Sequence, residues 1–345
     1  MFCLPAKKPE WTAEGNLRST NMSMTTTRLT TITAGLRFPE GPVAMTDGSV
    51  LVVEMRGKTL VRVQPDGEKS VIAELDGGPN GAAIGPDGRC YICNNGGFEF
   101  NQVGDTMLPG VASEDYVGGW IEAVDLATGA IEVIYRNCGD IPLRGPNDLV
   151  FDQHGGFWFT DTGKITARQR DRGAVFYARI DGSLIRQVIF PLDGPNGIGL
   201  SPDDRTLYVA ESWSGRVWSY EITGPGQIAR FAGPMPWERG RLLTGIPGYS
   251  MLDSLAIDNA GNICVADIPY GGITVVSPSG EIIERYPMPD SFVTNICFGG
   301  AGLRTAYITL SSVGQLVSMP WPRGGLPLHC LNRHEQPVAV GLADD

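Results

Sequence analysis

The 345-residue sequence predicts an all-β protein folded as a six-bladed β-propeller. Three observations lead to this prediction. A pattern of two short apolar strands around a Gly/Asp/Asn turn occurs six times along the chain. The copies follow one another at about 40 to 67 residues, which is the period of a propeller blade. No helical periodicity of useful length lies between them.

The stretch GPNDLVFDQHGGFWFTD, residues 145–161, shows the pattern most clearly. Its two β-prone runs flank a segment with the composition of a turn. A hairpin returns to its starting point, so we expect Asn147 and Asp161 to lie at the same end of it. The other five copies are residues 38–54, 78–94, 194–211, 251–267 and 293–309.

The third residue of every copy is an acid or an amide, and in a propeller these six positions meet on one rim of the central channel. They are Glu40, Asn80, Asn147, Asn196, Asp253 and Asn295. Turn preference accounts for one or two such residues but poorly for all six, so we predict a functional ring. A second polar set ends the hairpins: Glu54, Asn94, Asp161, Glu211, Asp267 and Thr309.

The ends of the chain predict how the ring of blades closes. Residues 28–33 alternate like a strand, and we expect them to complete the sheet that contains residues 315–319, which removes an exposed edge. The predicted organisation is therefore a poorly ordered lead-in over 1–27, the propeller over 28–323 and a C-terminal tail over 324–345.

Charge and cysteine content limit the partners and the compartment. The net charge of −11 and the pI near 4.8 argue against a nucleic-acid or anionic-membrane partner. The first 40 residues lack an apolar run long enough for a signal peptide, and no later run is long enough to span a membrane. The seven cysteines show no repeating spacing. We therefore expect a reduced, cytoplasmic protein.

Four ring residues from four blades offer only oxygen donors: Glu40, Asn147, Asn196 and Asp253. Oxygen-only sets favour calcium, whereas zinc prefers histidine or cysteine; Zn²⁺, Mn²⁺ and Mg²⁺ stay open as alternatives. The chain has no G-x-S-x-G motif, and His154 falls in a turn, so a histidine-based triad is disfavoured. If the protein is an enzyme, the sequence predicts metal-assisted chemistry.

The motifs PEGPV at 39–43, the stretch at 145–161, GPNGIGLSPD at 194–203 and LDSLAID..GNICVAD at 252–267 resemble the SMP-30/gluconolactonase/luciferin-regenerating enzyme family. The likeness covers roughly 38–310. It implies a divalent ion, usually calcium, in the channel and hydrolysis of a small-molecule lactone. It also implies metal ligation by Glu40, Asn196 and Asp253, with Asn147 as a ligand or a substrate-orienting residue.

We expect Asp253 to be the catalytic carboxylate, acting as a base on water, with a nucleophilic role left open. Asn147 is the second catalytic candidate. The candidate substrate-binding residues are Asn80, Arg144, Tyr116 and Trp120. Family members with an arginine two residues before the Asn147 position use it on sugar-lactone oxygens, and here Arg144 stands three before.

Loops on the ring side, at 96–120, 163–173 and 233–250, would select the substrate, and the aromatic residues of the first and third favour a lactone less polar than a sugar acid. Three alternatives remain open: a phosphotriester hydrolase, a strictosidine-synthase-like condensing enzyme, and a non-catalytic binding propeller.

Overall fold

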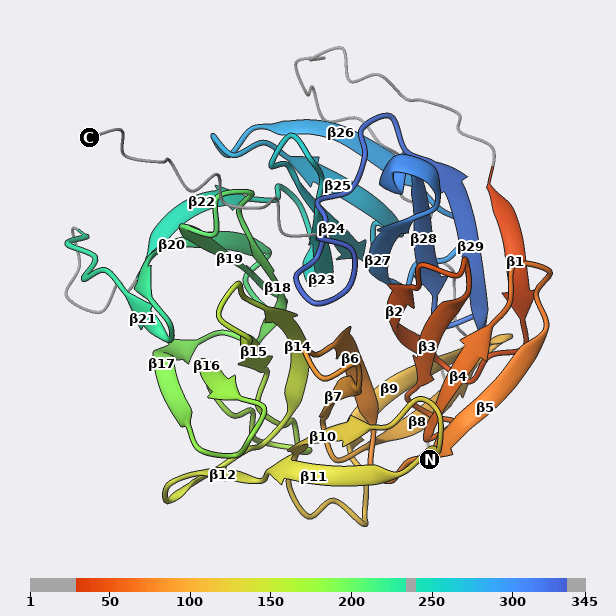
Figure 1. The fold of residues 1–345 in the computed structure, drawn as a ribbon, viewed down its shortest axis with the longest axis horizontal. Helices are drawn as coiled ribbons and strands as arrows, with labels where there is room; N and C mark the ends of the chain where they lie inside the picture. The colour runs from red at the N-terminus through yellow and green to blue at the C-terminus, as the bar shows by residue number, and fades with distance from the viewer. Residues whose placement is uncertain (1–28, 234–239, 334–345) are drawn as a thin grey trace, which may run out of the picture.

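Six antiparallel sheets surround a central channel in the computed structural model, which describes residues 29–233 and 240–333 (Figure 1). Within these ranges the elements are strands, apart from one short 3-10 helix, η1 (Ala301–Leu303). The predicted all-β, six-bladed propeller is confirmed. No helix among the described residues is long and apolar enough to cross a membrane.

Every blade has four main strands, ordered here from the channel outwards. Blade one contains β2 (Pro39–Ala44), β3 (Val50–Glu54), β4 (Thr59–Val63) and β5 (Lys69–Glu74). Blade two contains β6 (Pro79–Ile84), β7 (Cys90–Asn94), β10 (Trp120–Val124) and β11 (Ile131–Tyr135). Blade three contains β14 (Pro146–Phe151), β15 (Gly156–Asp161), β16 (Gly173–Arg179) and β17 (Ile185–Leu192).

The other three blades repeat this order. Blade four contains β18 (Pro195–Leu200), β19 (Thr206–Glu211), β20 (Arg216–Gly224) and β22 (Arg241–Gly245), with β21 (Gln227–Ile228) also on β20. Blade five contains β23 (Met251–Ile257), β24 (Ile263–Ile268), β25 (Gly272–Val276) and β26 (Ile282–Pro287). Blade six contains β27 (Val293–Gly299), β28 (Thr305–Leu310), β29 (Gln315–Pro320) and β1 (Thr30–Ala34).

Two small hairpins lie outside the blades. One is formed by β8 (Phe98–Val103) and β9 (Thr106–Ala112), and the other by β12 (Asn137–Cys138) and β13 (Ile141–Pro142). The β8–β9 hairpin belongs to the predicted loop 96–120 between the second and third strands of blade two.

Strand β1 closes the propeller, as the sequence predicts. It pairs antiparallel with β29, so that Thr30 lies opposite Ser318 and Ala34 opposite Gln315. The outermost strand of blade six thus comes from the start of the propeller, and the first and last strands of the propeller share one sheet. The predicted lead-in, residues 1–27, lies outside the described residues.

The hydrophobic core is divided into six clusters, one between each pair of neighbouring blades. Side chains alternate along a strand, so one strand supplies two clusters. In β15, Phe157 and Phe159 face blade two, whereas Trp158 faces blade four. Both faces of each sheet are buried, which explains why the second strands read as continuous apolar runs.

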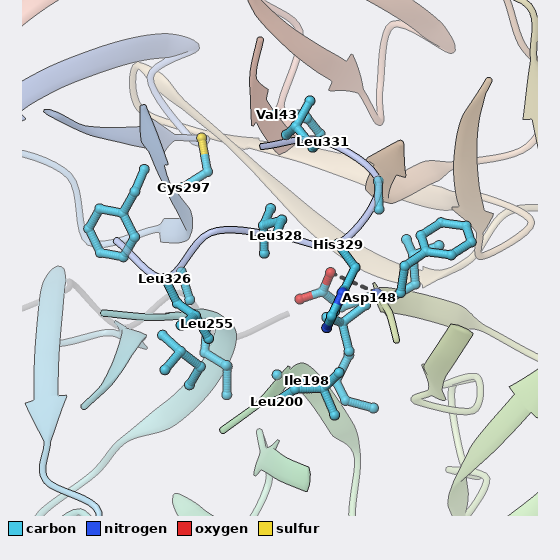
Figure 2. Close-up of a pocket in the computed structure, with 18 of the residues that line it drawn as sticks. Val43, Asp148, Ile198, Leu200, Leu255, Cys297, Leu326, Leu328, His329 and Leu331 are labelled. Carbon is cyan, nitrogen blue, oxygen red and sulfur yellow. Dashed lines mark hydrogen bonds between the residues drawn. The ribbon is translucent and has the colours of Figure 1, made fainter. Parts of the chain in front are cut away.

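The described part of the predicted tail crosses the end of the channel opposite the ring. Backbone bonds join Gly325 to Leu303 and Leu326 to Ile257. Figure 2 shows Leu326, Leu328 and Leu331 facing the inner strands, with an apolar cavity of about 100 Å³ between them. His329 and Arg333 both bind the carboxylate of Asp204 at 2.9–3.1 Å.

A chain that begins at residue 35, and so lacks β1, should lose stability because the edge of β29 becomes unpaired. We expect its melting temperature, followed by circular dichroism, to fall by at least about 5 °C relative to a chain that begins at residue 28. Light scattering should show aggregation of the shorter chain only. Equal melting temperatures would contradict closure through β1.

Candidate metal centre and active site

The ring residues sit where the pairing between the first and second strands is irregular. In blade one the register shifts directly after Glu40, and in blades two to five the shift spans the ring residue, for example between Pro146 and Leu149. Such a bulge turns side chains away from strict alternation and re-aims them. Here the bulge lies in the first residues of each inner strand, beside the channel axis.

Small residues let neighbouring inner strands approach closely at the ring. Gly41 follows Glu40 with a φ of 49°, and a Cβ there would collide with the carbonyl oxygen of Asn80. A Cβ on Gly197 would likewise collide with the backbone of Asp253. These approaches bring ring residues of adjacent blades within reach of one another.

Three carboxylates gather at the ring. Glu40 is 2% exposed and Asp148 is 8% exposed, while Asp253 is partly buried. Burial raises the pKa of Glu40 well above its usual range, and the charges of Asp253 and Asp148 raise it further. Burial also raises the pKa of Asp253 to about 7 and that of Asp148 to about 7. Among the described residues no basic side chain pairs with these three acids, so the ring concentrates carboxyl groups without a counter-charge.

Two amide oxygens at the ring are buried without a hydrogen-bond partner in the part of the chain that the structure describes. They are Oδ1 of Asn147 and Oδ1 of Asn196. The amide nitrogen of Asn196 donates to Ser212 Oγ at 3.2 Å, and that hydroxyl donates to the Leu252 carbonyl at 2.6 Å. These bonds fix which end of the Asn196 amide is left unpaired. A buried acceptor without a donor is costly unless another group satisfies it.

The donor set fits a hard cation. Glu40 and Asp253 supply carboxylate oxygens, and Asn147 and Asn196 supply the unpaired amide oxygens, a set that suits calcium. In the described parts of the chain, no group of three or more histidine, cysteine or acidic side chains is arranged so that it could hold a metal ion by itself, and this includes Glu40, Asp148 and Asp253. A centre here would depend on the amides as much as on the acids.

Asp148 is the ring carboxylate that the sequence prediction missed. It follows Asn147 directly, and strand alternation would place it on the opposite side. The bulge defeats that expectation: Asp148 is buried and lines the cavity below the ring (Figure 2). The sequence signal that could have identified Asp148 is the dipeptide Asn-Asp, an amide followed by an acid at the start of a buried strand.

Blade six has a different register from the one the sequence repeat suggests. Val293 pairs with Leu310, as Pro39 pairs with Glu54 in blade one. The position of the other ring residues is therefore occupied by Thr294, and Asn295 comes one residue later. Asn295 still lies beside the ring, where its amide approaches Glu40 Oε2 at 3.5 Å.

Four of the six residues of the second polar set bond the chain segments that lead into and out of the blades, whereas Asp267 accepts from Thr274 and Thr309 bonds Thr294. Asp161 accepts backbone N–H groups from Arg144, Gly145 and Gly163 at 2.7–2.9 Å. Arg37 N donates to Glu54, Gly78 N to Asn94 and Asp193 N to Glu211 in the same way. The two ends of the hairpin at 145–161 therefore have different roles. Asn147 faces the channel, and Asp161 holds the neighbouring loops.

The candidate substrate residues occupy different environments. Asn80 is the ring residue of blade two and is buried near the start of β6. Tyr116 donates through its hydroxyl to the carbonyl of Arg144 at 2.6 Å, and Arg144 Nε bonds Asp171 at 2.9 Å. Trp120 is buried, and its indole N–H donates to Glu122 at 2.8 Å, which holds the ring within blade two.

The fold and the ring define a six-bladed β-propeller with a candidate cation centre on its axis. Residues 38–312 match the family model described as the SMP-30/gluconolactonase/LRE-like region. The match spans most of the sequence, and the chain belongs to this family. The resemblance seen in the sequence motifs is confirmed.

Curated relatives include two lactonases. The gluconolactonase of Zymomonas mobilis is 27% identical over 314 residues, which cover 83% of this chain and 79% of that protein. The lactonase drp35 of Staphylococcus haemolyticus is 28% identical over 293 residues, which cover 81% of each chain.

Solved structures show the same fold. A gluconolactonase of Xanthomonas campestris has a TM-score of 0.67 at 21% identity and covers 89% of this chain and 94% of its own. The calcium-binding protein regucalcin of Agrobacterium tumefaciens has a TM-score of 0.65 at 17% identity and covers 84% and 92%. At these identities the likeness establishes architecture.

Replacing Asp161 by asparagine should destabilise the fold and leave metal binding intact. The amide would present a donor to three N–H groups that now share a charged acceptor, which should lower the free energy of unfolding by roughly 2–3 kcal/mol. Urea denaturation measures this loss, and calcium titration of the same variant serves as the control. Unchanged stability with lost activity would make Asp161 a catalytic group instead.

Proposed function

We propose that this protein is a calcium-dependent lactone hydrolase. The observation that carries the proposal is the ring itself, where carboxylates and two unpaired amide oxygens meet without a basic side chain from residues 29–233 or 240–333. Lactonases among the relatives support the reaction, and the calcium-binding neighbour supports the choice of ion. The substrate would be a small cyclic ester.

Glu40, Asn147, Asn196 and Asp253 would hold the cation. When bound, the cation supplies Lewis acidity toward the carbonyl group of the lactone. Asn196 is pre-oriented for this role by its bond to Ser212, and Asn147 presents its unpaired oxygen from the neighbouring blade. The ligands come from four blades, so the rigid fold fixes their spacing.

Asp253 is the proposed base because it is a ring carboxylate that retains partial exposure, so water can reach it. Water attacks the carbonyl carbon and passes a proton to the Asp253 carboxylate. The ester C–O bond of the lactone then breaks, and Asp253 returns the proton to the departing oxygen, giving a hydroxy acid. The charge of Asp148, which is buried beside it, raises the pKa of Asp253 and so favours proton uptake.

Asn80 and Arg144 are the proposed contacts to polar oxygens of the substrate. Asn80 is the ring residue of blade two, and Arg144 is fixed by Asp171 and by the bond from Tyr116. Tyr116 would therefore act by positioning Arg144. Trp120 would act still further from the substrate, through the packing of blade two.

A cytoplasmic location completes the proposal. Each cysteine among the described residues is unpaired, namely Cys90, Cys93, Cys138, Cys264, Cys297 and Cys330. Free cysteines, four of them buried, suit a reducing compartment.

A hydrolysis screen tests the proposal. Purified protein would be offered sugar, aliphatic and aromatic lactones and a set of phosphotriesters, each with calcium and with a chelator. Lactone opening that stops with chelator and returns with calcium supports the proposal. Chelator-resistant hydrolysis, or activity confined to phosphotriesters, would overturn it.

Glu40→Gln should weaken calcium binding without unfolding the protein. The variant keeps one oxygen for the cation and removes one negative charge, so we expect affinity to fall by about tenfold or more. Isothermal titration calorimetry measures the change, and circular dichroism checks the fold. Unchanged affinity would show that Glu40 is not a ligand.

Asp253→Asn should retain partial calcium binding and lose most lactone hydrolysis. Asparagine leaves an oxygen for the cation but cannot accept the proton, and a missing base commonly reduces the rate by about 10²–10⁴-fold. The comparison is kcat of the calcium-saturated variant and parent. A parental rate would assign the base elsewhere, with Asp148 the next candidate.

A further inference from the structure

The lysine that follows β15 in blade three, Lys164, is buried at the ring-side rim. Lys164 is 2% exposed, and its ammonium nitrogen donates to the backbone oxygen of Asn95 at 2.7 Å and to Asn95 Oδ1 at 3.3 Å. Among the described residues no carboxylate forms an ion pair with it; the nearby Asp171 pairs with Arg144 instead. A buried lysine without a counter-ion calls for a specific role.

Two aromatic rings enclose the Lys164 nitrogen. It lies 3.6 Å from the ring centre of Phe98 and 5.0 Å from that of Tyr116. Attraction between a cation and an aromatic face strengthens when water is excluded. These two aromatics, which the sequence suggested for substrate contact, are thus engaged with a lysine.

The anchor does not depend on a single protonation state. Burial lowers the pKa of Lys164 to about 7, Asp161 acts to raise it and Arg144 acts to lower it. A neutral amine still donates to the two oxygens of Asn95, and the ammonium adds its attraction to the rings. Lys164 can therefore hold Phe98 in place on either side of neutrality.

Phe98 begins the β8–β9 hairpin, which lies beside blade one in Figure 1. Within the hairpin, Phe100 packs edge-on against Phe38 at 5.2 Å, and Phe38 precedes the ring residue Glu40 by two positions. The hairpin thus extends from blade two to the rim of the channel beside the ring residue Glu40.

The tip and the end of the hairpin contact two further blades. Met107 N donates to the Ser312 carbonyl in blade six at 3.2 Å, and Ala112 N donates to the Ile165 carbonyl, next to Lys164, at 2.8 Å. Single hydrogen bonds of this kind open easily, so the position of the hairpin depends on its base.

We propose that Lys164 is a positioning residue that anchors the β8–β9 hairpin at the channel mouth, where the hairpin forms one wall of the substrate site. The nature of the site rests on the proposed function, whereas the anchoring rests on the contacts of Lys164 alone. Release of the hairpin would change how tightly substrate is held more than how fast the bound ester reacts.

The test compares Lys164→Met with the parent protein. Methionine keeps the unbranched stem and removes the amine. We expect the amides of Met107 and Ala112, which bond outside the hairpin, to exchange with deuterium about tenfold faster or more, while the amides of β15 are unchanged. With the lactone identified in the hydrolysis screen, KM should rise about fivefold or more and kcat should change less than about twofold.

Two further variants make the result specific. Lys58→Met is the matched control, because Lys58 also reaches this loop, at Asp115, but through an exposed pair that contributes little. Phe98→Leu should reproduce the effect of Lys164→Met, and the double variant should be no worse than either alone, since both remove one contact.

Unchanged exchange at Met107 and Ala112 in Lys164→Met, or additive effects in the double variant, would overturn the anchor. A third outcome is that Lys164→Met fails to fold or exchanges faster throughout blade three. If Phe98→Leu then leaves the amides of the hairpin protected from exchange, Lys164 is an ordinary core residue and the anchor is overturned. The exchange measurement needs neither metal nor substrate. An anchored hairpin in a protein without lactonase activity would therefore refute the proposed function and leave the anchor standing.

Discussion

Buried negative charge at one end of the channel is the constraint on which the site depends. Glu40, Asp148 and Asp253 come from three inner strands, and desolvation together with their mutual repulsion opposes ionisation of all three. A propeller cannot relieve this by moving one strand, because each blade packs against two others through a shared apolar cluster. The remedy available to a rigid fold is a counter-charge at the axis, and the unpaired oxygens of Asn147 and Asn196 complete a set that would receive it.

The same types of residue serve a second purpose only one strand away. Asp161 is as buried as the ring acids, yet its oxygens are taken up by backbone N–H groups of the loops on either side. Asn196 has its nitrogen bonded and its oxygen free, whereas Asn94 has both atoms bonded. What separates Asn196 from Asn94 is whether the amide oxygen has a hydrogen-bond partner. Neither residue type nor burial makes that distinction.

Periodicity carried most of the fold prediction, since six hairpins and a closing strand follow from the spacing of apolar runs and turns. The misses have a common physical origin in local departures from regular pairing. Asp148 was not predicted as a site residue because a bulge overrides strand alternation. In blade six, another irregularity in the pairing places Thr294 at the position where the sequence repeat predicted Asn295. Loop side chains were the least predictable part. Nothing in the sequence spacing shows that Phe98 and Tyr116 meet Lys164, which approaches from a different blade.

The central claim is that one cation sits on the channel axis among oxygens from four blades. Crystals grown with calcium, and matched crystals with terbium in its place, would locate it directly by anomalous scattering. The account predicts a single axial peak about 2.3–2.6 Å from oxygens of Glu40, Asn147, Asn196 and Asp253. A peak bound elsewhere, or an axis without a peak in crystals that contain saturating metal, would contradict it.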